Sequence, residues 1–475
     1  MGVENTMPHI GREETADGSL TPEEAVIEKH LRRKIDLLIF PVVALTYFLN
    51  LTDRTNLASA RLQGLESSLK LENNQFQTCV LIFFVGYLLA HIPSNLFLAS
   101  IRRPSLFLGG FTVLWGTISA LTSLVQSYEQ MVACRFLLGL AEAPFYPGMI
   151  FYLSKWYKMG ELNFRISILT GAGFLSGAFG SLLAAGTLQN LEGVRGLSSW
   201  RWLYIIEGSI TVFIGILLST ILPDFPETWT ALSSDVRHVA IKRVRRESNY
   251  TESKPHGWRD YVGAIALAFR DPRLYVFGLG GMTASVALGI QNFMPTLTRT
   301  LGYSNIVSLL LVAPPYVFVC AYMLGHGALC DLRQARFLFC IYPLPLCAAG
   351  FIMLMTLRSF AGRYVGLFLA MLICPAGSTM LTWATDTISY PASKRAVAFA
   401  AISMVGNSAG IWTPMTYRDE DSPQYQLAFG ICTGMIALMA LCAMVIRWLE
   451  KKKDERDPDV VTSSLPVTDL GGKVP

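Results

Sequence analysis

The chain has 475 residues, of which 52% are hydrophobic and only 15% are charged, and its mean hydropathy is +0.42. Such a composition excludes an ordinary soluble globular protein and is typical of a chain that crosses a membrane several times. The net charge of +5 is spread over many short polar segments, so we expect the lipid bilayer as a partner and no nucleic acid.

The first half of the chain predicts a polar tail followed by six membrane helices. Residues 1–34 are acidic and polar, and we expect them to form a disordered tail. Residues 35–222 contain six apolar runs, each about as long as a helix that spans a bilayer. They lie near residues 36–57, 78–98, 105–125, 131–153, 166–189 and 202–222.

The second half repeats this plan after a polar segment at residues 223–272. Within that segment, residues 236–247 predict a basic amphipathic helix, which we expect on the inner leaflet of the membrane. Residues 273–449 form the second bundle, and residues 450–475 are a second disordered tail. The six runs of this bundle lie near residues 273–294, 305–329, 336–357, 363–384, 397–417 and 427–449.

The fold predicted from these runs is an all-α polytopic membrane protein with 12 transmembrane helices in two six-helix bundles. With the amino terminus inside, the cytoplasmic segments carry about twice as many Lys and Arg residues as the other side, which satisfies the positive-inside rule. Clear examples are the pairs Arg102/Arg103 and Lys394/Arg395. We therefore expect both termini and the central segment in the cytoplasm, in a multi-pass, monomeric protein of the plasma membrane.

The fourth apolar run carries two charges, Arg135 and Glu142. Seven residues make almost two helical turns, so both side chains lie on one face, roughly 10 Å apart along the helix axis. A charge that faces lipid costs several kcal/mol. This face therefore points toward other helices or toward a water-filled cavity, and packing charges that join helices are the alternative to a functional role.

Other kinds of site receive no support from the sequence. All nine cysteines lie in or beside apolar runs, and the chain has no Cys-x-x-Cys pair and no histidine cluster, so we expect no disulfide framework and no metal. There is no phosphate-binding glycine loop and no Ser/His/Asp grouping. We expect a protein that is not an enzyme and has no cofactor.

Several segments resemble the major facilitator superfamily and, within it, the anion:cation symporter family. The loop DLRQAR at residues 331–336 is similar to the superfamily's loop motif of an acidic residue and spaced arginines. The finer resemblance is to the fungal allantoate permease branch, and it extends over about residues 30–450. It is carried in order by LNLTDRTNLASAR (49–61), FFVGYLLAHIPSNLFL (83–98), RFLLGLAEAPFYPG (135–148), SSWRWLYIIEGSI (198–210) and LPDFPE (222–227).

This resemblance implies a secondary active transporter that takes up a small organic anion, such as a carboxylate, vitamin or ureide, together with protons. It implies that Asp53 and Glu142 bind protons, that Arg54 meets the substrate carboxylate, and that Arg135 mediates between the two acids. The depths along the helices also allow Asp53 and Arg135 to pair. With Glu207 included, one negative charge is in excess, and we expect Glu142 to carry the compensating proton in the substrate-free protein.

Two amides in the second half are candidates for substrate binding. Gln291 lies about eighteen residues into the seventh span, at the repeat equivalent of Asp53 and Arg54, and Asn407 lies midway along the eleventh. Hydrogen bonds between helices are an alternative role for both amides. At the level of the whole protein, an exporter or precursor carrier of a fungal secondary-metabolite pathway and a nutrient sensor that does not transport remain alternatives.

Overall fold

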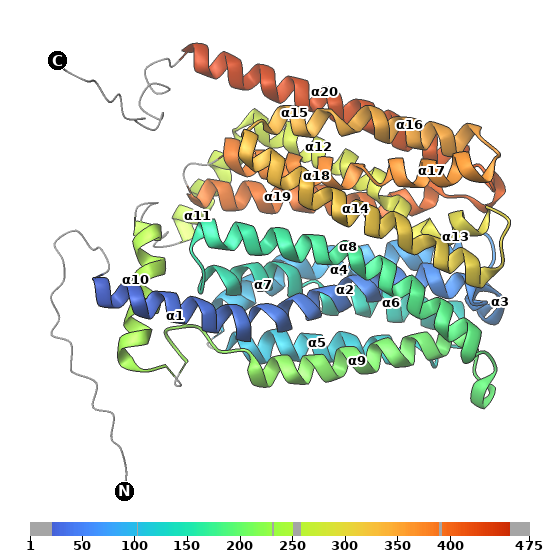
Figure 1. Cartoon of the computed structure of the whole chain (residues 1–475), viewed down its shortest axis with the longest axis horizontal. Coiled ribbons are helices and arrows are strands. Elements are labelled where there is room, and N and C mark those ends of the chain that lie inside the picture. The colour runs from blue at the N-terminus through green and yellow to red at the C-terminus, as the bar shows by residue number, and fades with distance from the viewer. Residues whose placement is uncertain (1–20, 102, 230–231, 250–257, 389–391, 457–475) are drawn as a thin grey trace, which may run out of the picture.

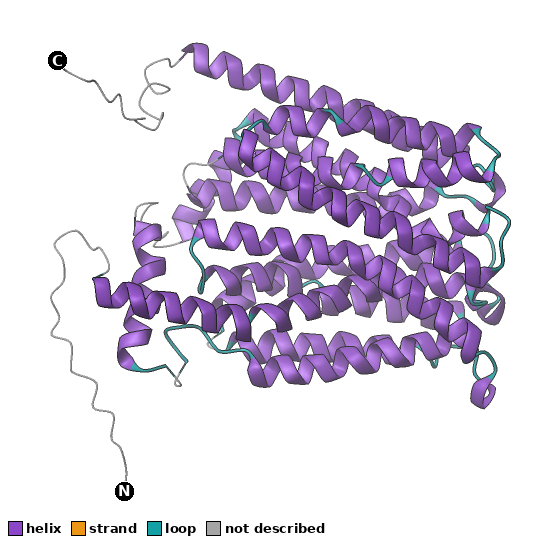
Figure 2. Cartoon of the chain, viewed as in Figure 1, coloured by secondary structure: helices purple, strands orange, loops and turns teal. Residues whose placement is uncertain are grey.

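The computed structural model describes residues 21–101, 103–229, 232–249, 258–388 and 392–456. In these ranges the chain forms helices and connecting loops without any strand (Figure 2). The long helices of the first half lie together in the lower part of Figure 1, and those of the second half lie above them. The outer parts of both predicted tails, residues 1–20 and 457–475, lie outside the described residues.

The first bundle packs α5 against α9, α4 against α6, and α2 against α8. Two short helices, α3 (Leu65–Leu69) and η1 (Val194–Gly196), lie in its loops. Its long helices are α2 (Phe40–Leu62), α4 (Gln75–Ser100), α5 (Pro104–Thr122), α6 (Tyr128–Glu142) with α7 (Phe145–Ser154), α8 (Met159–Asn190) and α9 (Ser199–Ile221).

The second bundle packs α12 against α19 and α20, and α16 against α17. Several of its spans are broken into two or three pieces, and most breaks lie beside a proline, which removes a backbone donor from the helix. In chain order, with the pieces of one span joined by "with", its helices are α12 (Pro272–Leu288) with η2 (Gly289–Phe293) and α13 (Met294–Arg299), α14 (Asn305–Arg333), α15 (Arg336–Ile341) with α16 (Pro343–Thr356), α17 (Phe360–Ala370) with α18 (Ile373–Thr387), α19 (Ala392–Trp412) with η3 (Thr413–Thr416), and α20 (Gln426–Arg456). The short helix η4 (Asp419–Asp421) lies in the loop before α20.

The predicted fold class is confirmed. Ten helical spans among the described residues are long and apolar enough to cross a membrane. In chain order, α4 and α19 fill the two remaining positions, so each half supplies six. Helix α9 of the first bundle ends at Ile221, and α12 of the second begins at Pro272.

The expected disordered tails need correction where the structure describes them. Residues 22–34 belong to helix α1 (Pro22–Leu38), which begins with a capping box between Thr21 and Glu24 and continues almost directly into α2. The central segment holds α10 (Ser234–Asn249) and α11 (Trp258–Phe269), and α20 extends the second bundle to Arg456. The start of α1, the end of α20, α10 and α11 all lie at one end of the molecule (Figure 1).

The predicted helix at residues 236–247 is α10, and two of its basic side chains pair with acidic residues of the first bundle. Lys242 lies 2.9 Å from Glu24 of α1, and the fully buried side chain of Arg243 lies between Glu28 and Glu161. These ion pairs neutralise Lys242 and Arg243, two of the basic residues of α10. They attach α10 to α1 and to the start of α8, so this helix is part of the first bundle's end.

Polar contacts close the interface between the bundles at the end opposite α1. Arg61, at the end of α2, forms an ion pair of 2.7 Å with Asp419 of the second half. Nearby, Gln77 donates a hydrogen bond of 2.8 Å to the carbonyl oxygen of Tyr417. Among the described residues, no ion pair joins the two bundles at the end where α1 and α10 lie. Any cavity between the bundles is therefore sealed more firmly at the α3 end.

Candidate functional site

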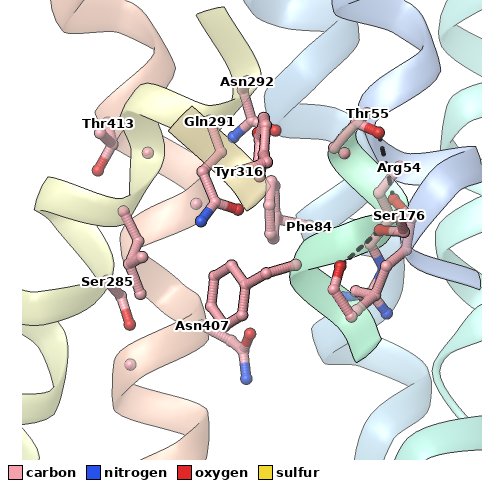
Figure 3. A pocket seen from close by; sticks show the side chains of 18 of the residues that line it. Arg54, Thr55, Phe84, Ser176, Ser285, Gln291, Asn292, Tyr316, Asn407 and Thr413 are labelled. Atoms are coloured by element: carbon pink, nitrogen blue, oxygen red, sulfur yellow. Dashed lines mark hydrogen bonds between the residues drawn. The ribbon is translucent and has the colours of Figure 1, made fainter. Parts of the chain in front are cut away.

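A cavity of about 290 Å³ lies between the two bundles. Its walls come from α2, α4 and α8 of the first half and from α12, η2, α14, α19 and η3 of the second (Figure 3). The volume is close to the lower end of the range seen for small-molecule sites. A site formed by both halves is what a carrier needs, because a movement of one bundle against the other changes access to it.

Helical spacing decides which residues of α2 and α8 reach this cavity. Tyr47, Leu51 and Arg54 follow one another at intervals of three and four residues, so they share one face of α2. On α8, Gly177 allows Tyr316 of α14 to approach closely, since a Cβ atom built on this glycine would lie 2.6 Å from the Tyr316 ring. The small residues of α8 therefore bring the two bundles into direct contact beside the site.

Arg54 is the cation of the cavity wall, and Glu142 holds it from behind. The Nε atom of Arg54 donates to Oε2 of Glu142 at 2.8 Å, and Asn50 donates to the same oxygen at 3.1 Å. The Arg54 guanidinium also lies over the ring of Tyr87, 4.6 Å from its centre. The side chain of Arg54 keeps 20% exposure, whereas that of Glu142 has none. The arginine can meet a ligand and the carboxylate cannot do so directly.

The position of Glu142 follows from the break in its span. Glu142 is the last residue of α6, and α7 starts three residues later at Phe145. Pro144 lies in the break, where it has no N–H to donate and would clash with the carbonyl group of an unbroken helix. The charged residue therefore lies at a local interruption near the middle of its helical span, Tyr128–Ser154.

Asp53 and Arg135 are both buried behind the wall, but they do not pair. Asp53 is 1% exposed and accepts hydrogen bonds from Ser119 at 3.0 Å and Thr211 at 3.4 Å. Arg135 donates to the carbonyl oxygen of Cys79 at 3.4 Å. No ion pair within 4.0 Å joins these two described residues, so the pairing that their depths allowed is wrong for this conformation, and the ion pair of the site is Arg54 with Glu142.

Glu207 of α9 is a third buried carboxyl group in the same bundle. It is 2% exposed, and neither of its side-chain oxygens has a hydrogen-bond partner in the part of the chain that the structure describes. It lies one turn before Thr211, which donates to Asp53. An ionised carboxylate without partners would be very costly here, so this position favours the neutral acid.

Two amides face Arg54 from the second half. Gln291 lies in the 3₁₀ segment η2, and its amide nitrogen lies 3.6 Å from the sulfur of Cys374. Asn407 of α19 donates to the carbonyl oxygen of Ser403 at 2.9 Å. The side-chain oxygens of both amides have no donor among the described residues, and both side chains line the cavity (Figure 3). Arg54, Gln291 and Asn407 are thus brought into one cavity.

Three polar residues that hold the charged side chains in place, Asn50, Ser119 and Thr211, were not predicted from the sequence. Asn50 lies four residues before Arg54, so it shares a face of α2 with it, and this spacing was an available signal. Ser119 and Thr211 come from α5 and α9, and their contact with Asp53 follows from the packing of three helices. No spacing within the sequence reveals such a contact.

The fold agrees with comparisons to known proteins. The family model described as Major Facilitator Superfamily matches residues 43–414. The chain belongs to the major facilitator superfamily. Members of this superfamily are transporters and not enzymes, which agrees with the expected absence of an enzymatic function.

Relatives of similar length support the assignment to the superfamily. The chain is 31% identical to "MFS-type transporter cnsO" of Penicillium expansum, over 90% of this chain and 84% of that protein. It is 30% identical to an uncharacterized transporter of Schizosaccharomyces pombe, over 91% and 89% of the two chains. Among solved structures, a D-xylose-proton symporter matches with a TM-score of 0.65 at 15% identity, over 86% of this chain and 96% of that one.

Proposed function

We propose that this member of the superfamily transports a small organic anion together with protons, as the allantoate permease branch of the anion:cation symporter family does. The observation that carries this proposal is the ion pair between Arg54, on the cavity wall, and the fully buried Glu142. A guanidinium group that is open to a cavity and surrounded by apolar helices binds carboxylates well, because planar hydrogen-bonding groups match on both sides.

Coupling follows from competition for one guanidinium group. Arg54 supplies a counter-charge to Glu142 at 2.8 Å, and in this scheme Glu142 is ionised while the cavity is empty of substrate. A substrate carboxylate at Arg54 adds a second negative charge beside the same cation. Glu142 then gains a proton, since a second unpaired anion in this poorly hydrated region would cost several kcal/mol. Anion and proton are thus bound in the same conformation and move together.

This scheme changes the proton that we assigned to the substrate-free protein. Total charge alone favours Glu142 as the site of the compensating proton. Since Arg54 neutralises Glu142 and Glu207 has no partner among the described residues, we now place the resting proton on Glu207. Asp53, with two hydroxyl donors, remains a second proton site. The positive charge of Arg135 influences the protonation of both Asp53 and Glu142.

The amides of the second half complete the substrate site. The side-chain oxygens of Gln291 and Asn407 have no donor among the described residues, and such oxygens accept hydrogen bonds from hydroxyl, amide or ring N–H groups. A ligand with its carboxylate on Arg54 and a donor group at the other end would span the two bundles. We further propose that the end carrying α1 and α20 is cytoplasmic and that the protein acts as a monomer in the plasma membrane.

The proposal is tested in proteoliposomes with a panel of labelled carboxylates and an imposed pH gradient. Glu142→Gln keeps the shape of the side chain and removes its proton exchange. We expect this variant to lose accumulation driven by the gradient, while it still exchanges labelled for unlabelled substrate across the membrane. Exchange survives because Arg54 and the two amides are still present.

The matched control is Glu129→Gln, an exposed glutamate at the start of the same helix α6. It removes the same charge far from the cavity, and we expect accumulation as in the unmodified protein. Uphill accumulation that survives in Glu142→Gln would contradict the assignment of Glu142. Failure of every carboxylate in the panel, with other substrates transported, would contradict the organic-anion class.

A further inference from the structure

A second hollow lies far from the central cavity, at the end of the second bundle where α11 and the end of α20 meet. It has a volume of about 400 Å³ and lies between the end of α11, the start of α12, the start of α19 and the end of α20. Its lining combines three basic side chains, one acidic side chain and two leucines. These residues are Leu267, Arg270, Asp271, Pro272, Arg273, Lys394 and Leu449.

The positive charges of this hollow exceed what its one carboxylate neutralises. Asp271 accepts from Arg273 at 2.7 Å and from Lys394 at 2.7 Å, so a single carboxylate serves two cations. Arg270 is exposed and forms no ion pair with any residue that the structure describes. The residues that line the hollow therefore carry two more positive than negative charges, and Asp271 holds two of the three basic groups in fixed positions. Glu450 lies close enough to Arg273 to act on its charge, but it is also paired with Arg447.

The surroundings of the hollow are apolar, which points to a ligand that is itself part of the membrane. The end of α11 exposes Ile265, Leu267 and Phe269, each between 43% and 48%, while Ala264 and Ala268 on its other face are buried. This helix packs against α19. An amphipathic helix at the end of a membrane bundle lies at the level of the lipid headgroups.

We propose that this hollow binds the phosphate-bearing headgroup of an anionic glycerophospholipid. Arg270 and the free N–H groups of Lys394 contact the phosphate, and the acyl chains extend along the leucines and the exposed face of α11. Basic pockets between membrane helices on the cytoplasmic side are where anionic headgroups bind. The proposal uses the cytoplasmic assignment of this end, but it does not depend on the transported substrate.

The test uses the full-length protein, purified in detergent and stripped of co-purified lipid. Native mass spectrometry compares binding of dioleoyl phosphatidylinositol with that of dioleoyl phosphatidylcholine at equal concentrations. We expect the anionic lipid to bind in preference. Arg270→Gln is expected to weaken its binding about 5-fold, since one basic residue near anionic lipid contributes about 1 kcal/mol, whereas Arg270→Lys retains binding.

The matched control is Arg358→Gln, which removes an exposed arginine from the opposite end of the second bundle. Arg270 forms no ion pair in the described parts of the chain, so its substitution is expected to leave the fold intact, and thermal unfolding of each variant checks this. Equal binding of the two lipids, or an equal loss in Arg270→Gln and Arg358→Gln, would overturn the proposal. Displacement of the lipid by millimolar inorganic phosphate would overturn it in favour of a soluble phosphate site.

Discussion

Glu207 provides a sharp test of the buried charges, because the structure predicts that its removal stabilises the protein. The side chain is 2% exposed, and both of its oxygens lack partners among the described residues. Burial of a polar group without a hydrogen bond costs about 1–3 kcal/mol in proteins. Methionine has a similar length and no such polar group, so we expect Glu207→Met to raise the free energy of unfolding by about 1–3 kcal/mol.

The comparison variant is Asp53→Leu, which removes the other carboxyl group of the same region. Asp53 accepts hydrogen bonds from Ser119 and Thr211, and both hydroxyl groups lose their acceptor in this variant. We expect it to lower the free energy of unfolding by about 1–3 kcal/mol. Unfolding of the purified protein by titration with denaturing detergent measures both values. A loss of stability in Glu207→Met would refute the assignment of a neutral, unpartnered Glu207.

Two further predictions concern packing and pH. Gly177→Val places side-chain atoms against Tyr316, whose ring is 2.6 Å from a Cβ atom at this position. A Cβ atom at Gly186 has no neighbour within 4 Å, so Gly186→Val is the control. Transport assays at equal protein amounts are expected to show a loss for Gly177→Val and none for Gly186→Val. Burial opposes ionisation of Asp271, but hydrogen bonds from its two basic neighbours outweigh it and lower the pKa of this carboxyl group well below its usual 3.8. A lowered pKa stabilises the fold at pH values above the usual pKa, and this stabilisation is lost as the pH falls below it. Thermal unfolding is therefore expected to show that Asp271→Asn lowers the free energy of unfolding by about 1.5–3 kcal/mol at pH 7, and by less below pH 4. A difference that grows as the pH falls would contradict this.

Apolar run length predicted the number and order of the membrane helices, because a bilayer demands about 20 apolar residues for each span. It did not predict where spans break. Pro144 was visible within the fourth run, yet only the packed structure places Glu142 at the interruption. The amphipathic pattern of α10 was also correct, but its partners were not predicted, because the acidic residues of α1 lie about 200 residues earlier in the chain.

The sequence analysis named Arg54, Gln291 and Asn407, which line the cavity, but it did not predict which side chains contact one another. Rise per residue gave the depth of each charged group along its helix, and this suggested that Asp53 and Arg135 could pair. The rotation of α2 about its own axis decides instead that Arg54 faces Glu142, whereas Asp53 faces Ser119 of α5 and Thr211 of α9. Such a rotation depends on the packing of several helices, and one sequence does not contain it.

Proton movement during uptake tests the central claim most directly. Proteoliposomes that contain a pH-sensitive dye receive, from outside, the carboxylate found to be transported, with no pH gradient present at the start. We predict that the interior becomes acidic as the labelled anion enters, and that Glu142→Gln abolishes this pH change. Uptake of the anion by the unmodified protein without any acidification would contradict proton coupling through the Arg54 and Glu142 pair.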